Sequence, residues 1–206
     1  DKVQLEGLRF DWMGRVLDGE DENHFVIQTP KFKLEYVYKP NGGLYTGYNV
    51  AYAAIQTELC VCIDSDDYMP DDAVEKIVDY WRQNGSLQYA GILGLDYNIA
   101  TKELIGGKFP EGLKEGYFYD LTLKNLHAGD TKPVMRTDLM KQVAPQVGFP
   151  EEKNFNPIYM MLQVCDKAPI LLMNENLCNV EYQIGADSMS QAIWRQYMNS
   201  ARSFAK

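Results

Sequence analysis

The stretch that decides the fold is Leu59-Cys60-Val61-Cys62-Ile63, followed directly by Asp64-Ser65-Asp66-Asp67. Five consecutive apolar residues are typical of a strand that is covered on both faces in a parallel sheet. Three carboxylates within four residues repel one another, and a cation or solvent must neutralise them. In open α/β sheets, ligands bind beyond the carboxyl ends of the strands, which is where these carboxylates fall. The pattern predicts a ligand site at this end of the sheet.

Strands and helices alternate around this stretch. We expect a strand over residues 33–38, a helix over 46–54, and a helix over 73–81 that Asp71 or Asp72 caps, followed by a strand over 88–95. Further on, the pattern indicates a helix at 158–165, a strand at 170–173 and an amphipathic helix at 190–204. This alternation predicts an α/β fold with a mainly parallel central sheet flanked by helices. The length favours one domain over residues 1–206.

The composition narrows the possible partners. The net charge of −9 makes binding to a nucleic-acid backbone unfavourable, so we expect no nucleic-acid partner. No apolar run of about 18 residues is present, which excludes a membrane span from the sequence. The four cysteines, Cys60, Cys62, Cys165 and Cys178, form no CxxC pair, and we expect buried, reduced thiols in a cytoplasmic protein.

The acidic loop, defined here as residues 64–67, has other possible readings when it is considered alone. An EF-hand beginning at Asp64 would have Met69 where the turn requires Gly, and a strand precedes the loop where a helix is needed. An aspartyl-phosphate phosphatase is expected to continue with small or hydroxyl residues, whereas Asp67-Tyr68 follows here. A helix cap that faces solvent is a common use of such residues and stays open.

The order of the neighbouring motifs points to a family. Lys39-Pro40-Asn41-Gly42-Gly43, then Asn49 in the predicted helix, then the apolar strand and the acidic loop resemble the family-2 inverting glycosyltransferases. Members of this family have the nucleotide-binding fold called GT-A. A weaker resemblance to one bacterial subgroup continues through residues 129–138, 149–153 and 174–182.

This resemblance implies roles for individual residues. Asp66 would bridge Mn²⁺ or Mg²⁺ to the diphosphate of a nucleotide-sugar donor, Asp64 would lie against the ribose or the metal, and Asp67 would be a further metal ligand, support the site or meet the sugar. The remaining residues that it implies for nucleotide binding are Asp18, Lys39, Asn41, Gly42, Gly43, Asn49 and Ser65.

The resemblance is incomplete at two places. No segment that resembles the family's first nucleotide-binding strand precedes Phe10, and Asp18-Gly19-Glu20-Asp21 is a degenerate counterpart of the loop that reads the base, so the chain resembles a truncated member. Inversion needs a carboxylate base, for which Glu152 and Glu151 match best and Asp130 is a further candidate.

Together these features predict an enzyme that moves a sugar from a nucleoside-diphosphate sugar to a glycan or lipid-linked acceptor, with metal assistance and inversion. The alternatives are a catalytically silent module that binds nucleotide or carbohydrate on the same scaffold, and a plain interaction domain. We expect a cytoplasmic location, with peripheral association at the inner face of the cell membrane left open. The predicted helix at 190–204 has few basic residues for a membrane-surface helix, which favours packing against the domain.

Overall fold

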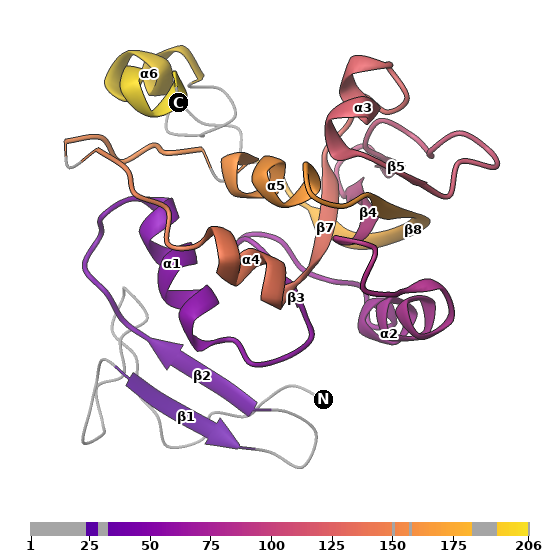
Figure 1. The fold of residues 1–206 in the computed structure, drawn as a ribbon, viewed down its shortest axis with the longest axis horizontal. Coiled ribbons are helices and arrows are strands. Elements are labelled where there is room, and N and C mark those ends of the chain that lie inside the picture. Colours follow the sequence, from indigo (N-terminus) through magenta and orange to yellow (C-terminus); the bar gives the residue numbers. More distant parts are fainter. Residues whose placement is uncertain (1–23, 29–32, 150, 157, 183–192, 206) are drawn as a thin grey trace. The chain divides into compact units, whose positions relative to one another are not determined.

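The computed structural model describes residues 24–28, 33–149, 151–156, 158–182 and 193–205. The chain forms two compact units, Asp1–Gly42 and Gly43–Lys206, and each is described by itself. In the first unit, β1 (His24–Gln28) pairs antiparallel with β2 (Lys33–Val37), with His24 opposite Val37 (Figure 1). β2 confirms the strand predicted over residues 33–38.

The second unit is built on a sheet of six strands in the order β3-β7-β4-β8-β6, with β5 paired to β4. The strands are β3 (Leu59–Val61), β4 (Gly91–Asn98), β5 (Glu103–Leu104), β6 (Glu115–Gly116), β7 (Thr131–Arg136) and β8 (Ile170–Val180). β7 runs antiparallel to both β3 and β4, and β4 runs parallel to β8. Consequently β3, β4 and β8 point the same way.

This sheet confirms the predicted α/β class, but it is mixed rather than mainly parallel. β7 is inserted antiparallel between β3 and β4, so β4–β8 is the parallel pair in the described part of the sheet. β3 lies at one end of the strand order, and its three residues are only half-buried. Cys60 packs against the core with α1, and Leu59 and Val61 pack against the core with α2, so the strand is covered on both faces as expected. The expected parallel pairing was wrong, because β3 pairs antiparallel with β7.

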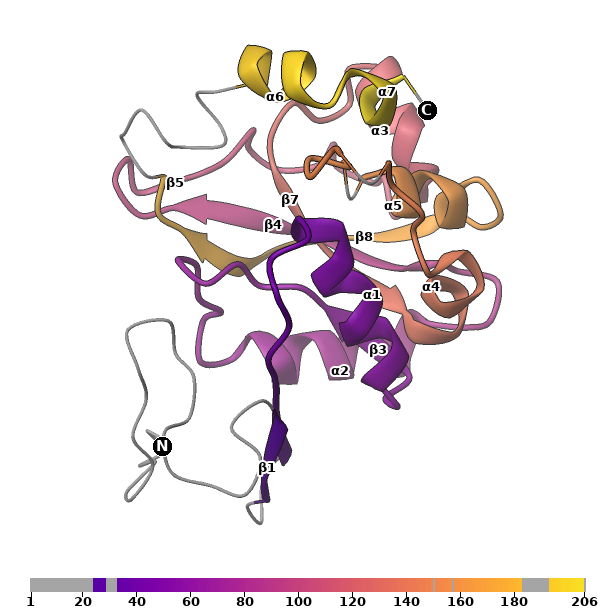
Figure 2. The ribbon, with the colours of Figure 1, turned by 90° about the vertical axis from the view of Figure 1, so that its left-hand side faces the viewer.

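Helices cover both faces of the sheet (Figures 1 and 2). One face packs against α1 (Leu44–Ala54), α4 (Thr137–Val143) and α5 (Ile158–Cys165), which contribute buried residues to one core. The other face packs against α2 (Ala73–Asn84), which contributes Ala73, Ile77 and Trp81 to a second core. Burial of these apolar faces on both sides stabilises the layered arrangement.

β4 connects the two cores because successive side chains of a strand point to opposite faces. Leu93 and Leu95 belong to the core with α5, whereas Ile92 belongs to the core with α2, and all three are fully buried. At Gly94 a Cβ atom would lie 2.2 Å from Leu177 Cδ1, so a side chain there would collide with β8's side chains. The sheet is thus tightly packed on the side of α2.

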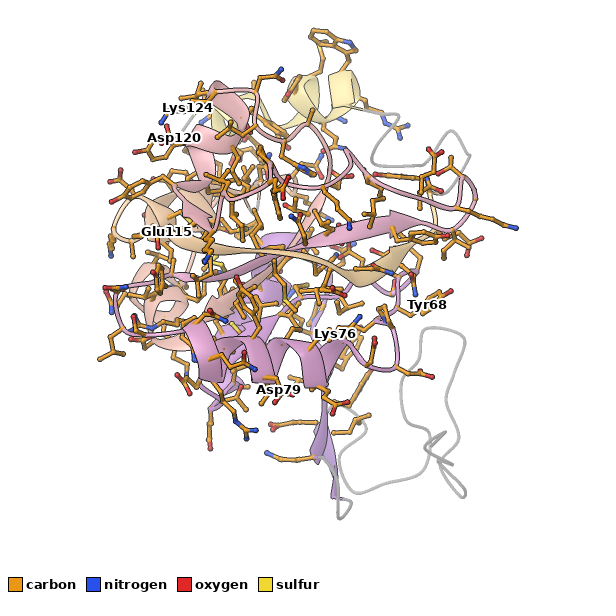
Figure 3. All side chains as sticks on the ribbon, turned by 90° about the vertical axis from the view of Figure 1, so that its right-hand side faces the viewer. Tyr68, Lys76, Asp79, Glu115, Asp120 and Lys124 are labelled. Carbon is orange, nitrogen blue, oxygen red and sulfur yellow. The ribbon has the colours of Figure 1, made fainter. Side chains whose placement is uncertain are left out.

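α2 begins where the sequence predicts, although its cap differs. Asp72 occupies the N-cap position but makes no side-chain capping hydrogen bond. Its carboxylate instead pairs with Lys76 Nζ at 3.0 Å, and Lys76 also pairs with Glu175 of β8 at 2.8 Å (Figure 3). The predicted capping role is therefore replaced by an ion pair along the helix.

The C-terminal elements agree with the sequence in part. α5 spans the predicted residues 158–165, while β8 extends seven residues beyond the expected end of its strand at 173. The predicted helix at 190–204 is two short helices, α6 (Ile193–Asn199) and α7 (Ala201–Phe204), because Ser200 has a non-helical φ of −145°; its first residues lie outside the described part. α3 (Phe118–Leu123) completes the set of described helices.

Two further expectations concern cysteines and membranes. All four cysteines are free thiols, but only Cys165 and Cys178 are buried as expected, while Cys60 is half-buried and Cys62 is exposed. Among the described residues, no helix combines the length and the apolar character that crossing a membrane requires.

Candidate functional site

The acidic loop follows β3 and is fastened to the end of β8. Within the loop, Asp67 N–H donates to Asp64 O at 3.0 Å and closes a tight turn. Immediately afterwards, Tyr68 and Asn179 exchange two backbone hydrogen bonds of 3.1 and 2.8 Å. Figure 3 labels Tyr68 at this junction, where its side chain is exposed. The loop is therefore part of the sheet's edge and not a free surface turn.

The topology brings further charged residues to the same edge. Because β3, β4 and β8 run in one direction, their carboxyl ends meet the amino end of β7. Asp96 lies near the end of β4, Cys178 near the end of β8, and Asp130 and Lys132 at the start of β7. This is the edge at which open α/β sheets bind ligands.

The carboxylates of the acidic loop differ in their exposure. Asp64 and Asp66 are exposed, as is Ser65 between them. The side chain of Asp67 is only 8% exposed, and its Oδ2 lies 3.9 Å from Lys132 Nζ. Asp67 Oδ1 accepts a hydrogen bond of 3.4 Å from Glu181 N–H, just past β8. Two carboxylates of the loop thus face outward while the third faces the protein.

Lys132 joins Asp67 to a second buried carboxylate. Its Nζ lies 3.8 Å from Asp96 Oδ2, and Asp96 is 3% exposed. Asp96 Oδ1 is buried without a hydrogen-bond partner in the described structure. Burial raises the pKa of Asp96 to about 7, although Lys132 opposes this shift. Burial alone would lower the pKa of Lys132, but Asp96, Cys178 and Asp67 together raise it, so the ammonium stays charged.

Asp130 also reaches this edge. The hydroxyl of Tyr182, two residues past β8, donates a hydrogen bond to Asp130 Oδ2. Burial, followed by this hydrogen bond to a carboxylate, raises the pKa of Tyr182, so the phenol keeps its proton. Asp130 also contributes to the raised pKa of Asp96, which places its charge close to the buried pair.

The other two candidates for the base have different surroundings. Glu152 accepts hydrogen bonds from Ser203 N–H at 2.7 Å, Ser203 Oγ at 2.6 Å and Arg202 N–H at 3.2 Å. It thereby satisfies backbone donors in the first turn of α7. Burial opposes the charge of Glu152, but these hydrogen bonds outweigh it and lower the pKa. Glu151 pairs with the guanidinium of Arg202.

Asn49 and Gly43 make contacts that the fold itself requires. Asn49 Nδ2 donates to Gln146 O at 2.8 Å, and Gln146 N–H donates to Asn49 Oδ1 at 2.8 Å, so the amide joins α1 to the loop after α4. Gly43 has a φ of +96°, and a Cβ there would lie 2.2 Å from Lys153 O. Glycine at this position permits the close approach of two backbone segments.

The remaining predicted nucleotide-binding residues lie in the first unit. Lys39 Nζ donates to Pro40 O at 2.7 Å. Asn41 is exposed, and Gly42 is half-buried. Asp18 lies outside the described residues. The roles of these four residues stay predictions.

The donor set at the loop fits a hard divalent cation. Among the described residues, no group of three or more His, Cys, Asp or Glu side chains converges as a protein-only metal cage. Mg²⁺ and similar ions usually bind through one or two carboxylates and complete their coordination with water and substrate phosphates. The exposed pair Asp64 and Asp66 matches that requirement, since its oxygens face outward.

The sequence motifs did not identify Asp96, Lys132, Cys178 or Tyr182 as site residues. A signal for Asp96 was present, because it comes directly after the strand predicted over residues 88–95. Lys132 and Tyr182 could not be placed in the same way, since the antiparallel insertion of β7 and the length of β8 bring them to the edge.

Comparison with known proteins agrees with this arrangement. The family model described as glycosyl transferase family 2 matches residues 18–126, which is just over half of the 206 residues. The match includes the acidic loop and Asp96 and supports the expected GT-A fold. None of the curated proteins compared with the chain matches it. The chain therefore belongs to glycosyl transferase family 2.

Proposed function

We propose that this glycosyltransferase moves a sugar from a nucleoside-diphosphate sugar to a hydroxyl group of a glycan or lipid-linked acceptor, with inversion and with Mn²⁺ or Mg²⁺. The observation that carries the proposal is the outward pair Asp64 and Asp66 at the carboxyl end of β3. An acidic protein of net charge −9 repels phosphate, so it needs a bound cation to hold a diphosphate, and the two carboxylates are ligands that such a cation prefers.

Asp64 and Asp66 would hold the metal, with Ser65 between them at the nucleotide. A bound divalent cation supplies positive charge that stabilises the leaving diphosphate. Lys39, Asn41, Gly42, Gly43, Asn49 and Asp18 are proposed for the nucleotide side on the resemblance alone. For Asn49 and Gly43, any such role has to coexist with their contacts to Gln146 and Lys153.

Asp130 is our choice for the catalytic base. It lies at the edge that carries the acidic loop, whereas Glu152 and Glu151 are engaged by α7 and Arg202. The Asp130 carboxylate would take the proton of the acceptor hydroxyl as its oxygen attacks the anomeric carbon. The new C–O bond forms as the bond from that carbon to the diphosphate oxygen breaks, and the electron pair leaves with the diphosphate.

Membership of the family does not indicate where in the cell the protein is found, so we base the proposed cellular location on the cysteines. Four free thiols fit a reducing compartment, so we propose the cytoplasm, with the inner face of the membrane as the place where a lipid-linked acceptor would be met.

An assay of nucleoside diphosphate release tests the proposal. The protein is incubated with Mn²⁺ and a panel of nucleoside-diphosphate sugars, and released nucleoside diphosphate is measured with and without acceptor. We expect metal-dependent release that Asp66→Asn lowers by about 100-fold or more. The matched control is Asp71→Asn, which removes an exposed charge outside the loop. A metal-dependent binding signal without release from any donor would favour the silent binding module instead.

A further inference from the structure

The buried group Asp67, Lys132 and Asp96 joins the acidic loop to β7 and β4 and has no place in the proposed transfer step. Its three ionisable side chains come from three segments: the loop after β3, the start of β7, and β4. The side chains are 8%, 10% and 4% exposed. A buried lysine between two buried carboxylates is costly to assemble, so its presence at the ligand edge calls for an explanation.

The contacts of Asp67 show what the group does to the loop. Asp67 is held on one side by Glu181 N–H at 3.4 Å and on the other by the Lys132 ammonium at 3.9 Å. Cys178 Sγ lies 3.9 Å from the same carboxylate. The neighbouring residue Tyr68 is bonded to β8 through both of its backbone groups. These contacts fix the C-terminal half of the loop against β8 and β7.

Fixing Asp67 inward determines where its neighbours point. The turn that Asp67 N–H closes onto Asp64 O leaves Asp64 and Asp66 outward and exposed. Without Lys132, the buried carboxyl groups of Asp67 and Asp96 would have no positive charge between them when both are ionised. One would have to gain a proton or move toward solvent, and the loop would lose its fixed geometry.

We propose that Lys132 is a positioning residue that holds Asp67 inward and so presents Asp64 and Asp66 to the divalent cation. Asp67 is then the anchor of the loop and not a ligand. The link to a cation rests on the proposed function, whereas the anchoring of the loop does not.

The sign of the effect on cation binding separates this role from a simple charge effect. Removing a positive charge near a cation site tightens cation binding if the loop stays in place. Removing a group that orients the ligands weakens binding, typically by 10- to 100-fold for partners behind a metal site. Lys132→Met should therefore raise the Kd for Mn²⁺ by about 10- to 100-fold.

Mn²⁺ alone is the probe, and its free concentration is followed by electron paramagnetic resonance. The matched control is Lys76→Met, which removes the same charge from a partly exposed ion pair between α2 and β8 and should change the Kd by less than about twofold. Asp67→Asn should weaken Mn²⁺ binding less than Asp66→Asn does. The effects of Asp67→Asn and Lys132→Met on the Kd should not add in the double variant, because both substitutions break the same contact between Asp67 and Lys132. Tighter or unchanged Mn²⁺ binding by Lys132→Met would overturn the proposal.

Hydrogen exchange gives a second readout that needs no metal. In Lys132→Met, peptides covering residues 62–70 and 176–182 should exchange faster than in the wild type, while peptides from α5 should not change. If Lys132→Met does not fold, the nearly isosteric Asp67→Asn takes its place in this measurement. Unchanged exchange in both segments would refute the anchoring. If the wild type binds no Mn²⁺ while the exchange result holds, the metal part of the proposed function fails and the anchoring stands.

Discussion

Asp96→Asn gives a pH-dependent change in stability whose size follows from the structure. Burial raises the pKa of Asp96 from its ordinary value of 3.8 to about 7. The folded protein therefore binds a proton at Asp96 between about pH 4 and pH 7, where the unfolded chain has released it. Stability that is present below pH 4 is lost as the pH rises through 7, and the total is about 4 kcal/mol at 1.36 kcal/mol per pKa unit.

Asn cannot ionise, so the variant lacks this dependence. Between pH 5 and pH 8, about two pKa units of the shift are traversed, and the wild type should lose about 3 kcal/mol relative to Asp96→Asn. Most other titrating groups are common to both proteins, and their contributions largely cancel in the difference.

Urea unfolding at pH 5, 6, 7 and 8, followed by circular dichroism, measures this difference. Asp71→Asn, at an exposed position, serves as the control and should show a flat difference over the same range. If the stability difference between wild type and Asp96→Asn stays constant from pH 5 to pH 8, the reasoning about the buried carboxylate is refuted.

Three further predictions test other parts of the structure. Asn49→Ala removes both hydrogen bonds to the loop after α4 and should lower the free energy of unfolding by about 1–3 kcal/mol. The control Asn84→Ala removes an exposed hydrogen bond within α2 and should lower it by less than about 1 kcal/mol. Equal losses in the two variants would contradict the role of Asn49. Asp130→Asn should lower kcat by about 100- to 10,000-fold and leave the Tm unchanged. Glu152→Gln should lower the Tm and keep most of kcat. The reverse result would make Glu152 the base. Gly94→Ala should destabilise the protein by about 1–3 kcal/mol in urea unfolding, and wild-type stability would show that Leu177 can move aside.

Local patterns made several elements predictable. Both ends of α5 could be predicted, because its run of apolar residues begins directly after Pro157 and stops at the polar residues that follow Cys165. The position of the acidic loop at the carboxyl end of a strand could be predicted from the apolar run before it, and its role as a ligand site stays a prediction. The break of the tail at Ser200 was not visible, because serine is tolerated inside helices and its backbone conformation depends on the surrounding packing.

Long-range contacts account for most of what the sequence could not reveal. Asn49 looks like a nucleotide ligand by its motif, yet its amide binds a backbone 97 residues away. Glu152 follows a motif that suggests a base, but α7 uses its carboxylate. Lys132 reaches Asp67 only because β7 runs antiparallel between β3 and β4. No local pattern carries such information, since it depends on strand order.

The most direct test of the central claim is a crystal structure of the protein soaked with Mn²⁺ and a set of nucleoside diphosphates. The account predicts an anomalous manganese peak within bonding distance of Asp66 or Asp64, with the diphosphate on its outer side and Asp67 still turned toward Lys132. A nucleoside diphosphate bound without manganese at Asp66, or no density at the acidic loop in any soak, would contradict it.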